Sequence, residues 1–450
     1  MKTKRRFTPS TTGVILLSFL TVILLGSALL SLPISAADGC RVPFVDALFT
    51  ATTATCVTGL VTLPVVTTWS AFGQAVLLVL IQIGGLGVIT VMSGFMVFLH
   101  YKMRLGDRML IQDSFNLNTM AGLADFIKRV LLGTLTVEGV GALLYMTVFV
   151  PDFGARGIWV AVFTAVSAFC NAGIDIIATD SLCSYVHDPV INAVTCLLIV
   201  LGGLGYIVWW DVLRVLRDGR RQKWQRLTLH SKIVLFVTAV LILGGAVLFL
   251  ILEYRNPLTI GTFSLPQKIG ASLFQSVTTR TAGFATVSQK GLSNGSAILS
   301  LLLMFIGGSP VGTAGGIKTV TLAVLIASTL AAVREKDSPT LFHRRLSRQA
   351  VGKALAVAVM AITIVFVSSL LLAAVTEAPA LDVLYETVSA AATVGLTRDL
   401  TPALNTAGKW IVIVTMYLGR VGPISLAILF NTKKKQPDPV KNPVEEISVG

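Results

Sequence analysis

Residues 49–59 read Phe49-Thr50-Ala51-Thr52-Thr53-Ala54-Thr55-Cys56-Val57-Thr58-Gly59, and the same arrangement occurs three more times along the chain of 450 residues. Each copy begins with an aromatic residue, continues through mostly small and hydroxylated residues, and leads to a glycine. The other copies begin at Phe163, Phe274 and Tyr385 and lead to Gly173, Gly283 and Gly395. Successive glycines are 114, 110 and 112 positions apart. This regularity indicates duplication of one unit.

A second glycine-rich landmark follows the four glycines after 25, 29, 24 and 24 residues. In chain order the landmarks are Gly84-Gly85-Leu86-Gly87, Gly202-Gly203-Leu204-Gly205, Gly307-Gly308-Ser309-Pro310 and Gly419-Arg420-Val421-Gly422. We predict four units of helix, re-entrant half-helix with a glycine loop, and helix, at 11–100, 127–213, 230–333 and 349–430, with a cytoplasmic tail at 431–450. Two crossings per unit return the chain to its starting side, so the units repeat in parallel about an axis along the membrane normal.

The composition predicts a membrane protein. Hydrophobic residues make up 54% of the chain and charged residues 13%, a balance that excludes a water-soluble monomer. Most of the apolar runs are long enough to cross a bilayer, which takes about 20 helical residues; they lie at 13–32, 72–99, 130–150, 190–209, 233–252, 296–333, 354–375 and 408–430. The first is too long for a signal-peptide core and seven more follow it. We predict an all-α integral membrane protein with eight transmembrane helices, its four units in a pseudo-fourfold arrangement around one pore.

The basic residues predict the orientation. Of 36 Lys and Arg, 26 lie before the first run, after the last, or in alternate connections, as the excess of basic residues in cytoplasmic loops requires. Both termini are therefore predicted on the cytoplasmic side of the cell inner membrane. Two basic residues fall within spans, Lys318 and Arg420, and eight fall in the outward connections: Arg41, Arg156, Arg255, Lys268, Arg280, Lys290, Arg398 and Lys409.

The glycine loops predict an ion filter. Irregular backbone survives at membrane depth only where it lines water or packs inside protein, and four such loops around an axis form a pore. Glycine lets the chain turn carbonyl oxygens toward the axis, where they can replace the hydration shell of a cation. The predicted ion-binding residues are Val57, Thr58, Gly59, Asn171, Ala172, Gly173, Thr281, Ala282, Gly283, Thr393, Val394 and Gly395. No TVGYG sequence is present, so the chemistry of the loops alone does not decide whether the filter selects potassium or sodium.

The half-helices favour cations as well, because each points the negative end of its dipole at the same centre. Asp46 and Asp382 lie near the starts of the first and fourth half-helices, and we interpret them as capping residues. Glu138, in the third span, is interpreted as a polar contact between helices.

The sixth span is broken in its middle, because glycine and proline both disfavour a helix interior. The break is long enough for a loop inside the pore, with a packing kink as the alternative. Its residues are Gly307, Gly308, Ser309, Pro310, Gly312, Thr313, Gly315, Gly316 and Lys318. We hypothesise that Arg420 pairs with the carbonyls or hydroxyls of this loop; a buried arginine that serves packing alone is the alternative.

Several classes of function are disfavoured. Too few charges are present to coat a nucleic-acid surface, and no Walker motif, clustered catalytic set or zinc-like cysteine and histidine spacing occurs in the sequence. No apolar helix carries the repeated arginines of a voltage sensor. A secondary transporter of another solute would normally show inverted repeats and a pair of broken helices, whereas one broken span is expected here.

The four aromatic-led half-helices, the single glycine in each filter loop and the broken sixth span resemble the Trk/Ktr/HKT superfamily of cation transporters over residues 11–430. The absence of two extra leading helices makes the chain more similar to the Ktr-type membrane subunits, the KtrB proteins. The resemblance implies that the four glycines coordinate K⁺, and glycine rather than serine at Gly59 favours K⁺ over Na⁺. It also implies that residues 307–318 form an intramembrane gating loop, which by our own hypothesis Arg420 holds across the path.

The resemblance further implies a membrane homodimer that is gated by a separate, cytosolic KtrA-like nucleotide-binding ring. The basic cytoplasmic segments are where such a ring, or anionic lipid, would bind, although they are also explained by topology alone. A sodium-coupled or sodium-permeable symporter of the same superfamily remains an alternative to potassium uptake, with Na⁺ as co-ion or regulator. An unrelated secondary solute transporter is a further alternative.

Overall fold

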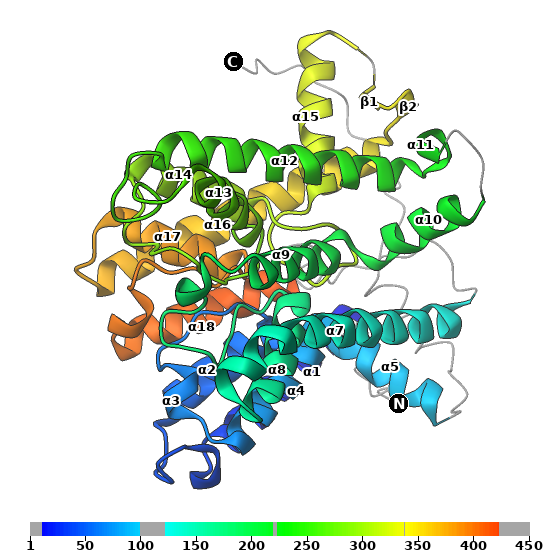
Figure 1. Ribbon diagram of the computed structural model, residues 1–450. Helices are drawn as coiled ribbons and strands as arrows, with labels where there is room; N and C mark the ends of the chain where they lie inside the picture. Colours follow the sequence, from blue (N-terminus) through cyan, green and yellow to red (C-terminus); the bar gives the residue numbers. More distant parts are fainter. Residues whose placement is uncertain (1–10, 100–121, 219–222, 337, 423–450) are drawn as a thin grey trace, which may run out of the picture.

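The structure is a computed structural model that describes residues 11–99, 122–218, 223–336 and 338–422 (Figure 1). The predicted tail at 431–450 and the end of the predicted eighth span lie outside the described residues. Within these ranges the chain is almost entirely helical, apart from loops and a short hairpin of β1 (Thr340–Leu341) and β2 (Arg344–Arg345).

Four long helices are apolar enough to cross a membrane: α1 (Thr11–Leu30), α7 (Leu123–Phe153), α12 (Leu229–Glu253) and α16 (Arg348–Val375). Each of them opens one of the predicted units. Their exposed side chains include Leu17, Leu243 and Phe366, each more than 60% exposed. An apolar exposed surface of this kind suits contact with lipid rather than with water.

Four shorter helices follow the long ones and are too short to span a bilayer. They are α2 (Phe44–Cys56), α8 (Arg156–Cys170), α13 (Leu265–Thr278) and α17 (Ala380–Ala391), and their side chains are mostly buried. These are the half-helices that the sequence predicts. In α2 and α8 the helix ends because the next residue, Val57 or Asn171, adopts a left-handed conformation.

A third set of helices completes the units: α4 (Ala71–Leu86), α9 (Pro189–Leu204), α14 (Asn294–Phe305) and α18 (Thr406–Val421). Each begins with a side chain that accepts a hydrogen bond from the backbone N–H three residues later, an arrangement that satisfies one of the free donors at a helix start. The capping residues are Ser70, Asp188, Ser293 and Asn405. The same cap in all four units fits their common origin.

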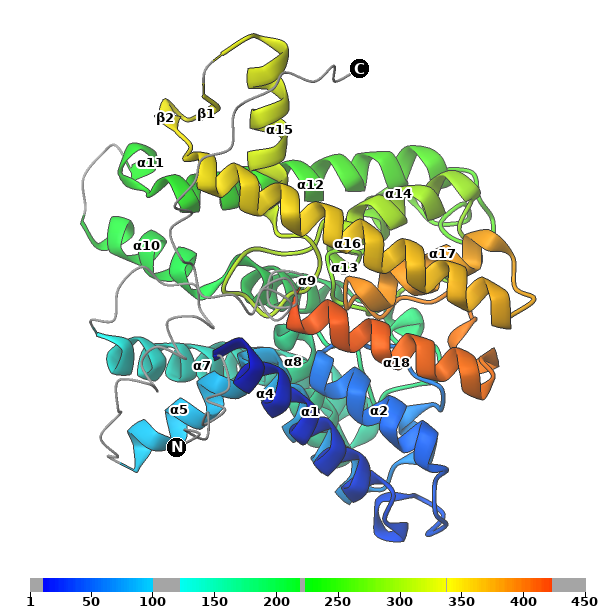
Figure 2. The ribbon, with the colours of Figure 1, turned by 180° about the vertical axis from the view of Figure 1, so that it is seen from behind.

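The units close into a ring. The third helix of each unit packs against the half-helix of the next, in the pairs α4 with α8, α9 with α13, α14 with α17, and α18 with α2. Figure 2 shows the last of these pairs, in which α18 and α2 lie side by side although they come from opposite ends of the chain. The half-helices are therefore held at the centre.

The sequence prediction of unbroken spans at 72–99 and 190–209 is wrong. Helix α4 is followed by α5 (Val88–Phe98) at an angle of 95°, and α9 by α10 (Tyr206–Arg217) at 98°. The breaks fall at Gly87 and Gly205, whose φ angles of 87° and 85° end the helix, and such angles favour glycine. The described residues therefore contain more than one broken span, and the number of broken spans no longer disfavours a secondary transporter.

The sixth span is broken as predicted, between α14 and α15 (Thr319–Val333). Counting each bent pair as one span gives six candidate spans within the described residues. The remaining short elements are η1 (Pro33–Ser35), α3 (Val65–Thr68), η2 (Cys183–Tyr185), α11 (Lys223–Arg226) and η3 (Thr401–Ala403).

Candidate functional site

The four predicted filter glycines meet at the centre of the ring. A methyl group on Gly59 would lie 2.5 Å from the carbonyl oxygen of Ala172, and one on Gly173 would lie 2.5 Å from that of Ala282. The same relation continues around the ring, from Gly283 to the carbonyl of Val394 at 2.6 Å and from Gly395 to the carbonyl of Thr58. Each glycine thus faces the carbonyl of the residue that precedes the glycine of the next unit, and the series closes on itself.

The four loops share two left-handed backbone positions. The glycines have φ angles of 99°, 62°, 82° and 99° in chain order, and the residues two positions earlier, Val57, Asn171, Thr281 and Thr393, also have positive φ, between 51° and 69°. Left-handed backbone is costly for the β-branched Val and Thr among them, so the surrounding structure must hold it. Larger side chains at the glycines would meet the neighbouring loop as well as strain the backbone.

A hydroxyl at the fifth position of each sequence copy holds the loop in this conformation. The backbone N–H of Gly59 donates to Thr53 Oγ1 at 2.9 Å, and that of Gly395 donates to Ser389 Oγ at 3.1 Å. In the other units Ser167 Oγ accepts from the N–H of Ile174 at 3.1 Å, and Thr278 Oγ1 donates to the carbonyl of Phe284 at 2.6 Å. The sequence prediction missed these residues, although a hydroxyl at the same place in every copy is a visible signal.

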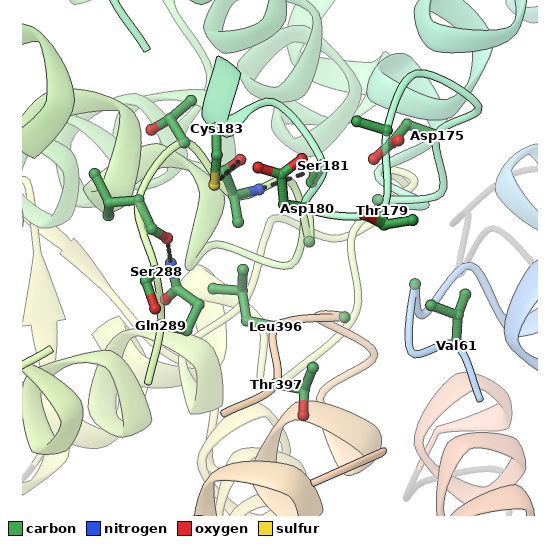
Figure 3. Close-up of a pocket in the computed structure, with 18 of the residues that line it drawn as sticks. Val61, Asp175, Thr179, Asp180, Ser181, Cys183, Ser288, Gln289, Leu396 and Thr397 are labelled. Carbon is green, nitrogen blue, oxygen red and sulfur yellow. Dashed lines mark hydrogen bonds between the residues drawn. The ribbon is translucent and has the colours of Figure 1, made fainter. Parts of the chain in front are cut away.

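A cavity of about 490 Å³ reaches all four filter glycines, and we call it the outer cavity because it lies on the side of the connections predicted to face outward. Figure 3 shows residues that line it, among them Val61, Asp175, Asp180, Gln289 and Thr397, which come from the loops that follow the four half-helices. The lining residues include three carboxylates, those of Asp175, Asp180 and Asp399, and no Lys or Arg among the described residues. A cavity of this charge attracts cations.

The loop in the broken sixth span packs directly against the filter loops. Ile306 and Ile317 pair at its neck, where Ile317 N–H donates to the carbonyl of Phe305 at 3.0 Å. Gly315 N–H donates to Thr281 Oγ1 at 3.2 Å, and Thr313 Oγ1 donates to the carbonyl of Phe169 at the end of α8, at 3.0 Å. This loop, residues 307–318, therefore touches the second and third units at filter depth.

The bend between α9 and α10 holds the loop from the side. Ser309 N–H donates to the carbonyl of Gly203 at 2.9 Å, and Thr313 N–H donates to that of Gly202 at 3.1 Å. In return, Tyr206 N–H donates to the carbonyl of Val311 at 3.2 Å. The broken fourth span, which the sequence prediction missed, thus supplies the bonds that position this loop.

Two partly buried basic side chains bond to carbonyls of the loop, those of Arg420 in α18 and of Lys318, the last residue of the loop itself. Arg420 donates through Nη1 to the carbonyl of Thr313 at 2.7 Å and through Nη2 to the carbonyl of Gly84. Lys318 Nζ donates to the carbonyl of Ala314 at 2.6 Å. Both side chains line an inner cavity of about 250 Å³, together with Val311, Gly312 and Ala314 of the loop. The filter and the loop lie between this cavity and the outer one.

Arg280, counted with the outward connections, lies in the re-entrant part of its connection rather than at the surface. Its side chain is buried, 6% exposed, beside the third filter loop, and Nη2 donates to the carbonyl of Gly307 at 3.3 Å. Counting basic residues along connections cannot separate a re-entrant loop from an outer one, because both lie between the same spans.

The interpretation of Asp46 and Asp382 as capping residues is also corrected. Both lie in the first turn of their half-helices, but neither caps the helix. Asp46 Oδ1 accepts from Lys409 Nζ at 2.5 Å and from Thr62 Oγ1 at 2.8 Å, and Asp382 Oδ1 accepts from Arg398 Nε at 2.7 Å. The two carboxylates therefore form ion pairs near the outer ends of the half-helices.

Glu138 joins two helices, as predicted. Its Oε2 accepts from Gln82 Nε2 at 3.2 Å and so connects α7 to α4.

The family described as TrkH, cation transport protein, matches residues 4–441. The chain belongs to the TrkH cation transport family. It is accordingly a multi-pass membrane protein and a transporter rather than an enzyme, and the resemblance predicted from the four glycine loops is confirmed.

The chain is similar in sequence to two known uptake proteins over nearly its whole length. The chain is 39% identical over 446 residues to the Ktr system potassium uptake protein B of Bacillus subtilis (strain 168), covering 99% of this chain and 97% of the relative. It is 37% identical over 456 residues to the potassium/sodium uptake protein NtpJ of Enterococcus hirae, covering 100% and 99%.

The fold of the TrkH family is also seen in a solved structure. The crystal structure of the potassium transporter TrkH from Vibrio parahaemolyticus superposes with a TM-score of 0.74, covering 95% of this chain and 86% of that one at 19% sequence identity. At this identity the likeness concerns the fold alone.

Proposed function

We propose that this protein takes up K⁺ across the cytoplasmic membrane through the ring formed by its four glycine loops. The observation that carries the proposal is the closed series in which each filter glycine faces the carbonyl of the residue preceding the next glycine. Four carbonyl oxygens, from Thr58, Ala172, Ala282 and Val394, then take the place of the hydration water of one dehydrated cation. The negative ends of the four half-helix dipoles and the acidic outer cavity support cation entry.

Buried polar atoms in the filter loops support a bound ligand. Thr58 Oγ1, Thr393 Oγ1 and both polar atoms of the Asn171 side chain are buried and have no hydrogen-bond partner among the described residues. Such atoms are costly unless something satisfies them, and a cation passing through the filter, with its remaining water, is the natural partner for the oxygens.

Potassium is the first candidate ion because Gly59 is a glycine, as are its three counterparts, and because a relative at 39% identity is a potassium uptake protein. Sodium permeation or sodium coupling is the second candidate, since the relative at 37% identity is a potassium/sodium uptake protein.

The gate is the loop at 307–318. Arg420 and Lys318 hold its carbonyls from the inner cavity, and their charge repels cations while the loop lies beneath the filter. Opening requires the loop to break its bond to Arg420.

The proposed topology has eight spans in four units, at 11–100, 127–213, 230–333 and 349–430. The spans are α1, α4 with α5, α7, α9 with α10, α12, α14 with α15, α16, and one that begins with α18. Both termini are cytoplasmic, as is the tail at 431–450.

The proposal also includes a membrane homodimer and a cytosolic KtrA-like ring. Its support is the name of the relative at 39% identity, which describes that protein as part of a Ktr system. The exposed Arg344 and Arg345 of the hairpin lie in a predicted cytoplasmic connection.

The experiment is ion flux through the full-length protein in liposomes, with Gly59→Ser as the variant and Gly244→Ser as the control. Gly59 has a φ of 99° and is crowded by the carbonyl of Ala172, whereas a methyl group on Gly244, in α12, would meet nothing within 4 Å. We expect K⁺ flux from the wild type and from Gly244→Ser, and a loss of at least tenfold in Gly59→Ser. Absence of K⁺ flux from the wild type, with Na⁺ or without it, would refute the proposal.

A further inference from the structure

The third filter loop differs from the other three. Only two residues, Thr279 and Arg280, separate the loop-holding hydroxyl residue Thr278 from the left-handed residue Thr281. In the other units three residues occupy this place. In those three units a small residue stands immediately before the left-handed residue: Cys56, Cys170 and Ala392. The third loop is thus one residue shorter and carries a large cation where its counterparts carry a small side chain.

The surroundings of Arg280 are apolar. With Val277 it lines a small pocket formed by Ile199 and Val200 of α9 and Ile242 of α12. Its side chain forms no ion pair with any residue that the structure describes, and its Nε has no hydrogen-bond partner among them. A guanidinium so placed is expensive to bury. Packing would be served as well by an aliphatic residue, so packing does not account for an arginine here.

The acceptor that Arg280 does have lies at the neck of the gate loop. Gly307, whose carbonyl accepts from Nη2 at 3.3 Å, is the first residue of the loop. A methyl group on Gly307 would collide with the carbonyl of Gly315, so the two ends of the loop touch at this point. Gly315 N–H in turn donates to Thr281 Oγ1 at 3.2 Å. Two consecutive residues of the third filter loop therefore hold both sides of the neck.

Arg280 holds the gate loop from a different side than Arg420 and Lys318 do. Arg420 belongs to α18 and Lys318 is the last residue of the loop itself; both line the inner cavity and bond to carbonyls at 313–315. Arg280 belongs to the filter itself. A displacement of the neck removes the acceptor of a buried cation, and the filter loop that carries the cation has to move with it or leave the charge unpaired.

We infer that Arg280 is a positioning residue that couples the third filter loop to the gate loop, so that the ion selectivity of the filter depends on the position of the gate. This inference rests on the proposed function. It assigns Arg280 no contact with the ion. Its effect on selectivity passes through Gly307 and Thr281.

The experiment compares Arg280→Met and Arg280→Lys in the full-length protein in liposomes. The K⁺-to-Na⁺ permeability ratio and the flux without any activating partner are measured on the same samples. Methionine suits the apolar surroundings, and replacing a buried charge with a packed apolar side chain is often neutral or stabilising. Arg280→Met is therefore expected to fold and melt like the wild type. It should nevertheless lose at least fivefold in permeability ratio and gain at least fivefold in unactivated flux. Lysine keeps a cationic donor, and Arg280→Lys should retain both values within about twofold.

The control is Lys268→Gln. Lys268 is also a buried cation in the third unit, bonded to the carbonyl of Tyr254 at 2.8 Å, but it lies at the start of α13, away from the gate loop. Its replacement should leave the permeability ratio unchanged.

Wild-type selectivity and gating in Arg280→Met would overturn the inference, and so would a loss of flux that follows loss of folded protein at constant permeability ratio. If Arg280→Met does not fold, the test rests on Arg280→Lys. This variant must then keep the wild-type permeability ratio and unactivated flux, and a fivefold change in its permeability ratio overturns the inference. A wild type without K⁺ flux would instead refute the proposed function.

Discussion

Single hydroxyl groups determine the shape of the filter. Thr53, Ser167, Thr278 and Ser389 each occupy the fifth position of their sequence copy and bond to backbone groups at or just after the filter glycine. The carbonyl of the same residue accepts from the N–H of the residue before the glycine, at 2.8–3.0 Å in all four units. One residue per unit thus holds the loop by both its side chain and its backbone, and the filter carbonyls take their direction from it.

Replacing Thr53 with valine should weaken ion binding. The variant keeps the shape of the side chain and leaves the N–H of Gly59 without its acceptor, at a cost of about 1–3 kcal/mol for an unsatisfied buried group. We expect the K⁺ concentration for half-maximal uptake to rise about tenfold. The measurement is uptake of Rb⁺ as a K⁺ tracer over a range of K⁺ concentrations.

The matched control for this variant is Thr52→Val. The Thr52 hydroxyl is also buried, but it bonds to the carbonyl of Leu48 within its own helix. Its loss should not alter the half-saturation value. Equal effects of the two variants would show that the hydroxyl of Thr53 has no special role in the filter.

At the level of helices and loops, the sequence predicted one of the broken spans and missed the breaks in two others. The loop at 307–318 was recognisable because glycine and proline are concentrated in it. The breaks at Gly87 and Gly205 were not, because an isolated glycine is common in membrane helices and nothing in the sequence shows which one takes a positive φ. The hydrogen bond from Arg280 to the carbonyl of Gly307 was not predictable either, because the two residues are 27 positions apart in the sequence.

Replacing Arg420 with glutamine should loosen the gate. The variant removes charge-assisted bonds to Thr313 and Gly84, each worth about 1.5–3 kcal/mol, and removes the positive charge from the inner cavity. We expect K⁺ flux without an activating partner to increase about tenfold or more. Flux measured in liposomes tests this, with the exposed Arg156→Gln as control. Unchanged flux in Arg420→Gln would favour the alternative in which this arginine serves packing alone.

The whole chain forms a ring whose closure was predictable in outline. The four sequence copies and their spacing indicate four parallel units, and the structure brings their glycines together as this predicts. The contacts that close the ring were not predictable, because they join residues from opposite ends of the chain. The pair of Asp46 in α2 and Lys409 in α18 is one of them, at 2.5 Å with side chains that are 10% and 18% exposed.

Breaking this pair should destabilise the ring. Lys409→Met leaves the carboxylate of Asp46 largely buried with Thr62 as its remaining side-chain partner, and loss of one member of a buried pair costs about 3 kcal/mol. We expect a clearly lower melting temperature in detergent. The double variant Asp46→Leu/Lys409→Met removes both charges and should recover at least half of the loss. A double variant as unstable as the sum of both single changes would show that the pair does not act as a unit.

The central claim is that the four glycine loops form one site for a dehydrated monovalent cation. The most direct measurement is anomalous diffraction from crystals of the full-length protein grown with Rb⁺ in place of K⁺. The ring geometry predicts an anomalous peak on the axis, within coordination distance of the carbonyl oxygens of Thr58, Ala172, Ala282 and Val394, which disappears in Gly59→Ser. An empty ring at Rb⁺ concentrations that saturate transport, or a peak confined to another part of the molecule, would contradict it.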